Sequence, residues 1–110
     1  MIKIEIYRKN LKIVKFTVNG HADFSEFGTD IVCSAVSTSV TQTLNAILEL
    51  LKLKPKYEYI EGFISCDLEN TNLNGKEEQL DILLESMYEM LKSISDEYSK
   101  NVKLIEKEAS

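Results

Sequence analysis

Apolar residues occupy every second position near the start of the chain, in residues 2–6 and again within residues 11–18. This alternation is typical of strands with one buried face, and a turn at residues 8–10 would join the two into an antiparallel hairpin. The expected inward residues are Ile2, Ile4, Ile6, Val14, Phe16 and Val18. The register of residues 11–14 stays ambiguous.

From residue 31 onward the apolar residues recur at the three- and four-residue spacing of a helix. They are Ile31, Val32, Ala35, Val36, Val40, Leu44, Ile47, Leu48 and Leu51. We expect this helix to run from about Ile31 to Leu53, because Pro55 cannot continue it. Its interior is rich in serine and threonine, which are weak helix formers, so tertiary packing must hold it together.

A second hairpin is expected at residues 57–60 and 63–68, with a turn at Glu61-Gly62 between them. Its inward residues would be Ile64, Cys66 and Leu68. Cys66 is therefore expected in the core, and we assign it no chemistry.

A second helix follows, with Asn74 as its predicted N-cap and Glu77 as the capping partner. Its apolar residues at helical spacing are Leu80, Leu83, Leu84, Met87, Leu91, Ile94 and Tyr98. Asn101 would end this helix, residues 102–105 predict a last strand, and residues 106–110 are expected to fray.

The element order β-β-α-β-β-α-β predicts an α/β fold of two layers. Hairpins make a mostly antiparallel five-stranded sheet, and two helices with one apolar stripe each fit on one of its faces. At 110 residues, the chain is expected to form a single domain over residues 1–110.

Composition and charge narrow the function classes. A formal net charge of -5 argues against a nucleic-acid partner and suits a basic peptide better, although most of this charge is expected to serve solubility. The alternating start of the chain is unlike a signal peptide, and no apolar run is expected to reach membrane-spanning length. We therefore expect a cytoplasmic protein that has no membrane partner and whose two cysteines form no disulfide.

The candidate chemistry lies in residues 20–37, which hold His21, the only histidine, and Cys33. A thiol reacts as its thiolate, which a nearby imidazole and a helix N-terminus both favour. With Asp30 as a predicted N-cap, Cys33 would fall in the first helical turn, and the preceding loop could bring His21 close. Spacing alone still favours a simpler interpretation, a buried cysteine and a structural histidine.

The same stretch resembles the signature of the ribosomal-processing cysteine proteases, the Prp family. The matching residues are Gly20-His21-Ala22, Gly28 and Asp30-Ile31-Val32-Cys33-Ser34-Ala35-Val36-Ser37, with continuation through Thr41-Gln42-Thr43. The predicted element order and length also agree with the family over nearly the whole chain. One departure is Ser34, where alanine is commoner in the family.

The resemblance implies that Cys33 is the nucleophile and His21 the general base of a cysteine endopeptidase. It implies supporting or substrate-binding roles for Asp30, Ser37, Gly20 and Gly28. The implied substrate is the N-terminal extension of a large-subunit ribosomal protein. The implied assembly is a homodimer, and no cofactor or metal is expected.

Several alternatives stay open at this point. Asp30 could cap the helix or orient His21, and we rank capping first. Residues 21–27, between Gly20 and Gly28, could form a lid or an ordinary surface loop. A zinc site lacks the usual paired spacings, a phosphate loop lacks its lysine, and redox chemistry lacks a resolving cysteine.

Two function classes follow from these features. The first is the cysteine endopeptidase described above. The second is a non-catalytic, ribosome-associated peptide-binding module of the same fold. The joint presence of His21 and Cys33 favours the enzyme, because a binding module has no need of both.

Overall fold

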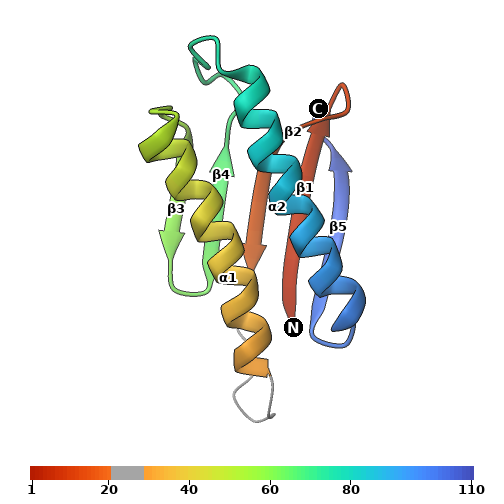
Figure 1. The fold of residues 1–110 in the computed structure, drawn as a ribbon. Helices are drawn as coiled ribbons and strands as arrows, with labels where there is room; N and C mark the ends of the chain where they lie inside the picture. The colour runs from red at the N-terminus through yellow and green to blue at the C-terminus, as the bar shows by residue number, and fades with distance from the viewer. Residues whose placement is uncertain (21–28) are drawn as a thin grey trace.

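The computed structural model describes residues 1–20 and 29–110 and has the predicted element order (Figure 1). The elements are β1 (Ile2–Lys9), β2 (Lys12–Asn19), α1 (Thr29–Asn45), a π-helical turn η1 (Ala46–Leu50), β3 (Lys56–Ile60), β4 (Phe63–Asp67), α2 (Glu77–Glu97) and β5 (Val102–Glu108).

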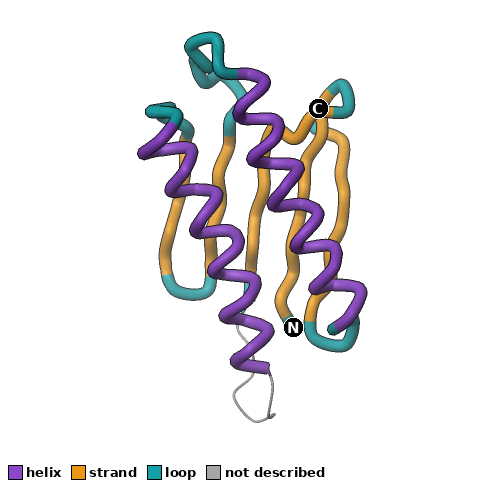
Figure 2. Tube along the Cα trace, in the orientation of Figure 1, coloured by secondary structure: helices purple, strands orange, loops and turns teal. Residues whose placement is uncertain are grey.

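The strands form one sheet in the order β3-β4-β2-β1-β5. Neighbouring strands are antiparallel except β1 and β5, which run parallel after the crossover through α2. Both helices lie on the same face of this sheet (Figure 1, Figure 2). The predicted two-layer sandwich is therefore confirmed, with β3 and β5 as the two edge strands.

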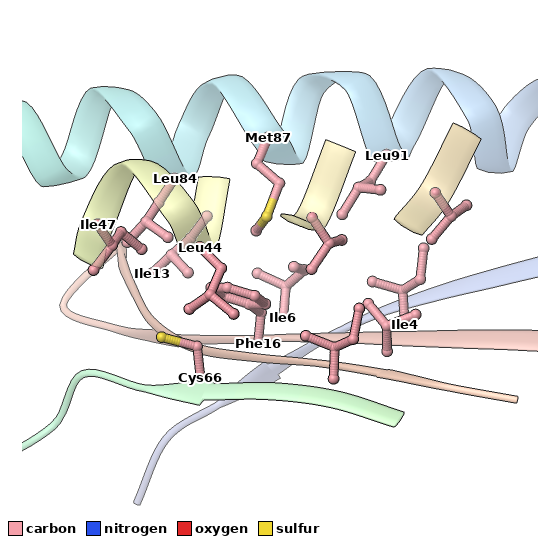
Figure 3. Close-up of a cluster of buried hydrophobic side chains, with 14 of the residues drawn as sticks. Ile4, Ile6, Ile13, Phe16, Leu44, Ile47, Cys66, Leu84, Met87 and Leu91 are labelled. Atoms are coloured by element: carbon pink, nitrogen blue, oxygen red, sulfur yellow. The ribbon is translucent and has the colours of Figure 1, made fainter. Parts of the chain in front are cut away.

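One apolar core fills the space between the sheet and the helices (Figure 3). The first helix contributes a buried stripe at helical spacing, namely Val32, Val36, Val40, Leu44 and Ile47. The second contributes Leu80, Leu84, Met87, Leu91 and Ile94. The sheet contributes Ile2, Ile4, Ile6, Ile13, Phe16, Val18, Ile64, Cys66 and Val102. The alternating and helical patterns thus predicted most of the core.

The serine- and threonine-rich part of α1 satisfies its hydroxyl groups within the helix. Ser39 and Thr43 donate hydrogen bonds to carbonyl oxygens four residues earlier, at 2.9 Å and 3.1 Å. Such bonds supply no tertiary attraction, so the buried stripe must hold the helix on the sheet. The helical path ends at Leu50, three residues before the predicted end at Leu53, where the wider π-turn gives way to a bend.

The inward set of β2 differs from the prediction at one position. Tyr7 pairs with Lys15 but Arg8 pairs with Ile13, so Val14 is an extra residue in the β1–β2 ladder. A bulge of this kind reverses the alternation locally. Ile13, at 3% exposure, therefore enters the core in place of Val14, and the predicted inward position of Val14 is wrong.

The predicted capping of the second helix is also wrong. The helix begins at Glu77, and the residue before it, Lys76, makes no side-chain capping bond. Asn74 instead lies in a turn, with φ of 53°, and its N–H donates to the side-chain oxygen of Asn72 at 3.0 Å. This Asx turn uses the N–H of Asn74, which in a capping box would bond to the side chain of Glu77, so the capping box does not form. The helix ends at Glu97, so Tyr98, 39% exposed, lies beyond its apolar stripe.

The end of the chain is ordered further than expected, because β5 continues to Glu108. The Arg8 guanidinium donates to both carboxylate oxygens of Glu85 on α2 and to Glu106 on β5, at 2.7–3.1 Å. These bonds raise the pKa of Arg8, and the bond from Arg8 lowers the pKa of Glu106. The prediction that residues 106–110 fray is wrong for residues 106–108, since ladder and charge pairing with β1 hold them.

The continuous helical stretch formed by α1 and η1 bears on the expectation that no apolar run reaches membrane-spanning length. By length and composition alone, residues 31–50 would be able to cross a membrane. This is weak evidence, since a helix that packs its apolar stripe on a sheet passes the same test. Here the stripe covers the sheet of the same chain, which accounts for its apolar character.

Candidate functional site

A groove of about 730 Å³ lies between the N-terminal half of α1 and the turn of the β3–β4 hairpin. Its apolar wall is formed by Ile2, Val18, Val36, Ile60, Phe63 and Ile64. Its polar rim is formed by Cys33, Ser34, Ser37, Tyr59 and Glu61, with Gly20 and Gly62 completing the lining. A groove with an apolar wall and a few polar groups is the usual form of a ligand site.

Cys33 and Ser37 enter this groove from consecutive turns of α1. Cys33 is half-buried and forms no disulfide, and it packs against the edge of the core while it lines the groove. The Ser37 hydroxyl donates to the Cys33 carbonyl oxygen at 2.6 Å. This bond commits the Ser37 proton to the backbone, which leaves the hydroxyl oxygen available to the groove as an acceptor.

The start of α1 is displaced from the prediction. The helix begins at Thr29 rather than Ile31, so Asp30 is its second residue and not the residue before it. Cys33 is consequently the fifth helical residue, one turn inside, where the prediction had the first turn. The free N–H groups of a helix are those of its first four residues, so they belong here to residues 29–32. The side chain of Asp30 lies outside the described part of the chain.

Gly20 directly follows β2 and lies beside Met1 and the turn of the second hairpin. Its N–H donates to the Gly62 carbonyl at 3.0 Å, which joins the end of β2 to the turn of the second hairpin. Its φ is +111°, and a Cβ there would collide with the carbonyl oxygen of Met1. The position therefore requires glycine for both backbone conformation and space. His21, Gly28 and the predicted lid, residues 21–27, lie outside the described residues.

Cys66 is confirmed as a core residue without access to solvent. Its side chain lies near Phe16 and Leu44, on the helix-facing side of β4 (Figure 3). Burial, with a smaller contribution from the charge of Asp67, raises the pKa of the Cys66 thiol to about 12. A thiol in that environment stays protonated and unreactive.

The second hairpin contributes groove residues that the sequence did not single out, namely Tyr59, Ile60, Glu61 and Phe63. The Tyr59 hydroxyl lies 3.0 Å from the Thr41 hydroxyl and so links the edge strand β3 to α1. The local sequence provides no signal for them, because Tyr59 and Ile60 follow an ordinary strand pattern, and their exposure of 53% and 58% is visible only in the fold.

A second and shallower hollow of about 1080 Å³ runs along α1 toward α2. It shares Ser37 and Tyr59 with the first groove, so the two meet at the link between Tyr59 and Thr41. Part of the hydroxyl-rich face of α1 lines it, including Thr38 and Thr41. Among the described side chains, no three histidine, cysteine or acidic residues come together as metal ligands.

Comparison with known proteins gives one consistent family. The sequence model of the family described as cysteine protease Prp matches residues 1–103. The ribosomal processing cysteine protease Prp of Staphylococcus aureus is 32% identical over 93 residues, which cover 84% of this chain and 86% of that protein.

Solved structures agree with this match. The essential ribosomal processing protease Prp from Staphylococcus aureus in complex with a substrate peptide has a TM-score of 0.83 and 28% identity. The alignment covers 97% of this chain and 100% of that one. The same protease with a covalently linked product peptide has a TM-score of 0.80 and 30% identity, over 97% and 100% of the two chains.

We predict that iodoacetamide labels Cys33 much faster than Cys66 in the folded protein. Cys33 lines the groove, whereas Cys66 is fully buried with a raised pKa. Mass spectrometry of digested protein after timed labelling measures both rates, and denatured protein, in which both thiols are accessible, provides the control. Equal labelling of the two in the folded state would contradict the assignment of Cys66 to the core.

We predict that Gly20→Ala destabilises the protein more than Gly75→Ala. Both glycines have positive φ, but nothing lies within 4 Å of a Cβ at Gly75. Gly75→Ala should cost about 1 kcal/mol of strain, and Gly20→Ala roughly 2 kcal/mol or more because the collision with Met1 is added. Chemical denaturation of the two variants gives the comparison, and equal losses would show that the β1 backbone yields freely.

Proposed function

The chain belongs to the cysteine protease Prp family, and we propose that it is a cysteine endopeptidase that removes the N-terminal extension of a large-subunit ribosomal protein. The observation that carries the proposal is the groove lined by Cys33, a half-buried thiol on the N-terminal half of a helix beside an apolar wall. Membership of the family supports the protease class, and the names of the relatives support the ribosomal substrate.

In this proposal, the Cys33 sulfur attacks the scissile carbonyl carbon while His21 accepts the thiol proton. His21 follows Gly20 in the sequence, and Gly20 lines the same groove as Cys33, which supports the pairing. The negative oxygen of the tetrahedral intermediate would accept hydrogen bonds from the free N–H groups of residues 29–32.

The remaining steps return the enzyme to its starting state. The intermediate collapses, the carbon–nitrogen bond breaks, and the leaving amine takes the proton from His21. The product is a thioester on Cys33, and water, deprotonated by His21, hydrolyses it to a carboxylate and a free thiol. Ser37 supports the site in this scheme, because its bond to the Cys33 carbonyl fixes the backbone that carries the nucleophile.

The cellular context is also proposed from the family. We expect a cytoplasmic protein that acts as a homodimer and requires no cofactor, metal, nucleic acid or membrane. Size-exclusion chromatography with light scattering tests the homodimer at working concentration.

We predict that Cys33→Ser and His21→Ala each abolish cleavage and leave the melting temperature nearly unchanged. Serine is almost isosteric with cysteine, but its hydroxyl is a poor nucleophile at neutral pH. The measurement is cleavage of the purified ribosomal protein that carries its extension, together with thermal melting of each variant.

Cys66→Ala provides the matched control for loss of a thiol. It should lower the melting temperature, because it leaves a small cavity in the core, and it should retain cleavage. Full activity in Cys33→Ser or His21→Ala would remove the protease proposal. Binding of the extension without cleavage by the wild type would favour the peptide-binding module instead.

We predict that Asp30→Ala reduces both cleavage and stability, the latter by about 0.5 kcal/mol. A carboxylate in the first turn of a helix interacts favourably with the free N–H groups, and its loss should shift the helix start that positions Cys33. Thermal melting and cleavage assays, with Asp30→Asn as the charge-only control, give the measurement. An unchanged melting temperature with lost activity would instead indicate that Asp30 orients His21.

A further inference from the structure

The edge strand β3 is exposed along its whole length. Each of its five residues is solvent-accessible, and in the described part of the chain its only strand partner is β4. Exposed edges are a hazard for aggregation, and natural proteins blunt them with charged residues. Lys56 and Glu58 are such residues, yet tyrosines at 57 and 59 leave the strand able to accept another chain.

The pairing register shows which backbone groups of β3 are free. The two-residue turn at Glu61-Gly62 closes on the pair Ile60 and Phe63, and hydrogen-bonded pairs then alternate along the ladder. Residues 56, 58 and 60 therefore direct their N–H and C=O groups to β4. Tyr57 and Tyr59 direct theirs outward, away from the sheet.

The free edge is continuous with the groove that holds Cys33. Tyr59 and Ile60, the last residues of β3, line that groove. The hydroxyl contact between Tyr59 and Thr41 fixes the edge strand relative to α1, which carries the thiol. An extended chain that leaves the groove at Tyr59 would therefore reach Tyr57 next, two residues or roughly 7 Å along the strand.

We propose that the substrate peptide binds as an added strand along the edge of β3, pairing with the backbone of Tyr57 and Tyr59. This inference rests on the proposed protease function and adds the manner of binding. Main-chain pairing of this kind provides affinity without demanding particular side chains, while the apolar wall of the groove selects residues next to the scissile bond.

A proline substitution tests the pairing from the enzyme side. Tyr57→Pro removes an outward N–H and no bond of the β3–β4 ladder, and proline is tolerated on edge strands in that position. Tyr57→Ala is the matched control, since it removes the same ring and keeps the N–H. We expect kcat/KM to fall roughly fivefold further in Tyr57→Pro than in Tyr57→Ala, mainly through KM.

The fold of these variants is checked separately. Melting temperatures of the two should agree, and Cys33 should alkylate at the same rate in both. Glu58→Pro should melt at lower temperature, because its N–H is directed to β4. Equal kcat/KM for Tyr57→Pro and Tyr57→Ala would overturn the proposal. A changed oligomeric state with unchanged peptide binding would also overturn it, because the edge would then join two copies of the chain.

The peptide side gives a second test that needs no enzyme variant. Overlapping synthetic peptides that span the extension are methylated at one backbone nitrogen at a time, and binding and cleavage by the wild type are measured. Pairing predicts losses at alternate residues, since every second N–H of an added strand points to β3. If methylation at every position leaves binding and cleavage unchanged, the strand-pairing proposal is wrong and the protease proposal stands. If binding is lost at alternate positions but the wild type cleaves no peptide, the protease proposal alone is wrong.

Discussion

The geometry of the site depends on the packing of α1 against the sheet. Serine and threonine fill much of this helix, and they have little intrinsic preference for helical structure. The stripe of branched residues, from Val32 to Ile47, is almost completely buried and supplies the stabilisation. Because Val32 and Val36 flank Cys33 on this helix, the contact that holds α1 also fixes where the thiol meets the groove.

The opposite wall is fixed by contacts of a different kind. Gly20 bonds to Gly62 and lies against Met1 so closely that no side chain fits, which joins β1, β2 and the second hairpin at one point. Tyr59 of the same hairpin contacts Thr41 of α1 where the two hollows meet. The second hairpin is thus bonded to Gly20 at its turn and to α1 through Tyr59, and the groove lies between these two contacts and the N-terminal half of α1.

Local sequence patterns predicted the features that depend on neighbouring residues in the chain, namely the strands, the helices and the part of the site on α1. Alternation and helical spacing located the five strands and two α-helices of the described residues, since a buried face imposes its period on the sequence. The motif around Cys33 contains the part of the polar rim that lies on α1, namely Cys33, Ser34 and Ser37, because these residues are close together on one helix. The bulge at Val14 and the Asx turn at Asn74 depend on competition between hydrogen bonds, which hydrophobic periodicity does not record.

The groove residues of the second hairpin were missed for a physical reason. Tyr59 and Ile60 follow the pattern of any strand, and only the tertiary fold brings them opposite Cys33, which precedes them by more than twenty residues. The two cysteines also show that a local sequence pattern does not determine a residue's tertiary environment. Cys33 and Cys66 lie on elements with similar apolar patterns, yet one thiol lines a groove and the other is fully buried with a raised pKa. Position in the fold, rather than residue type, therefore decides which thiol can react.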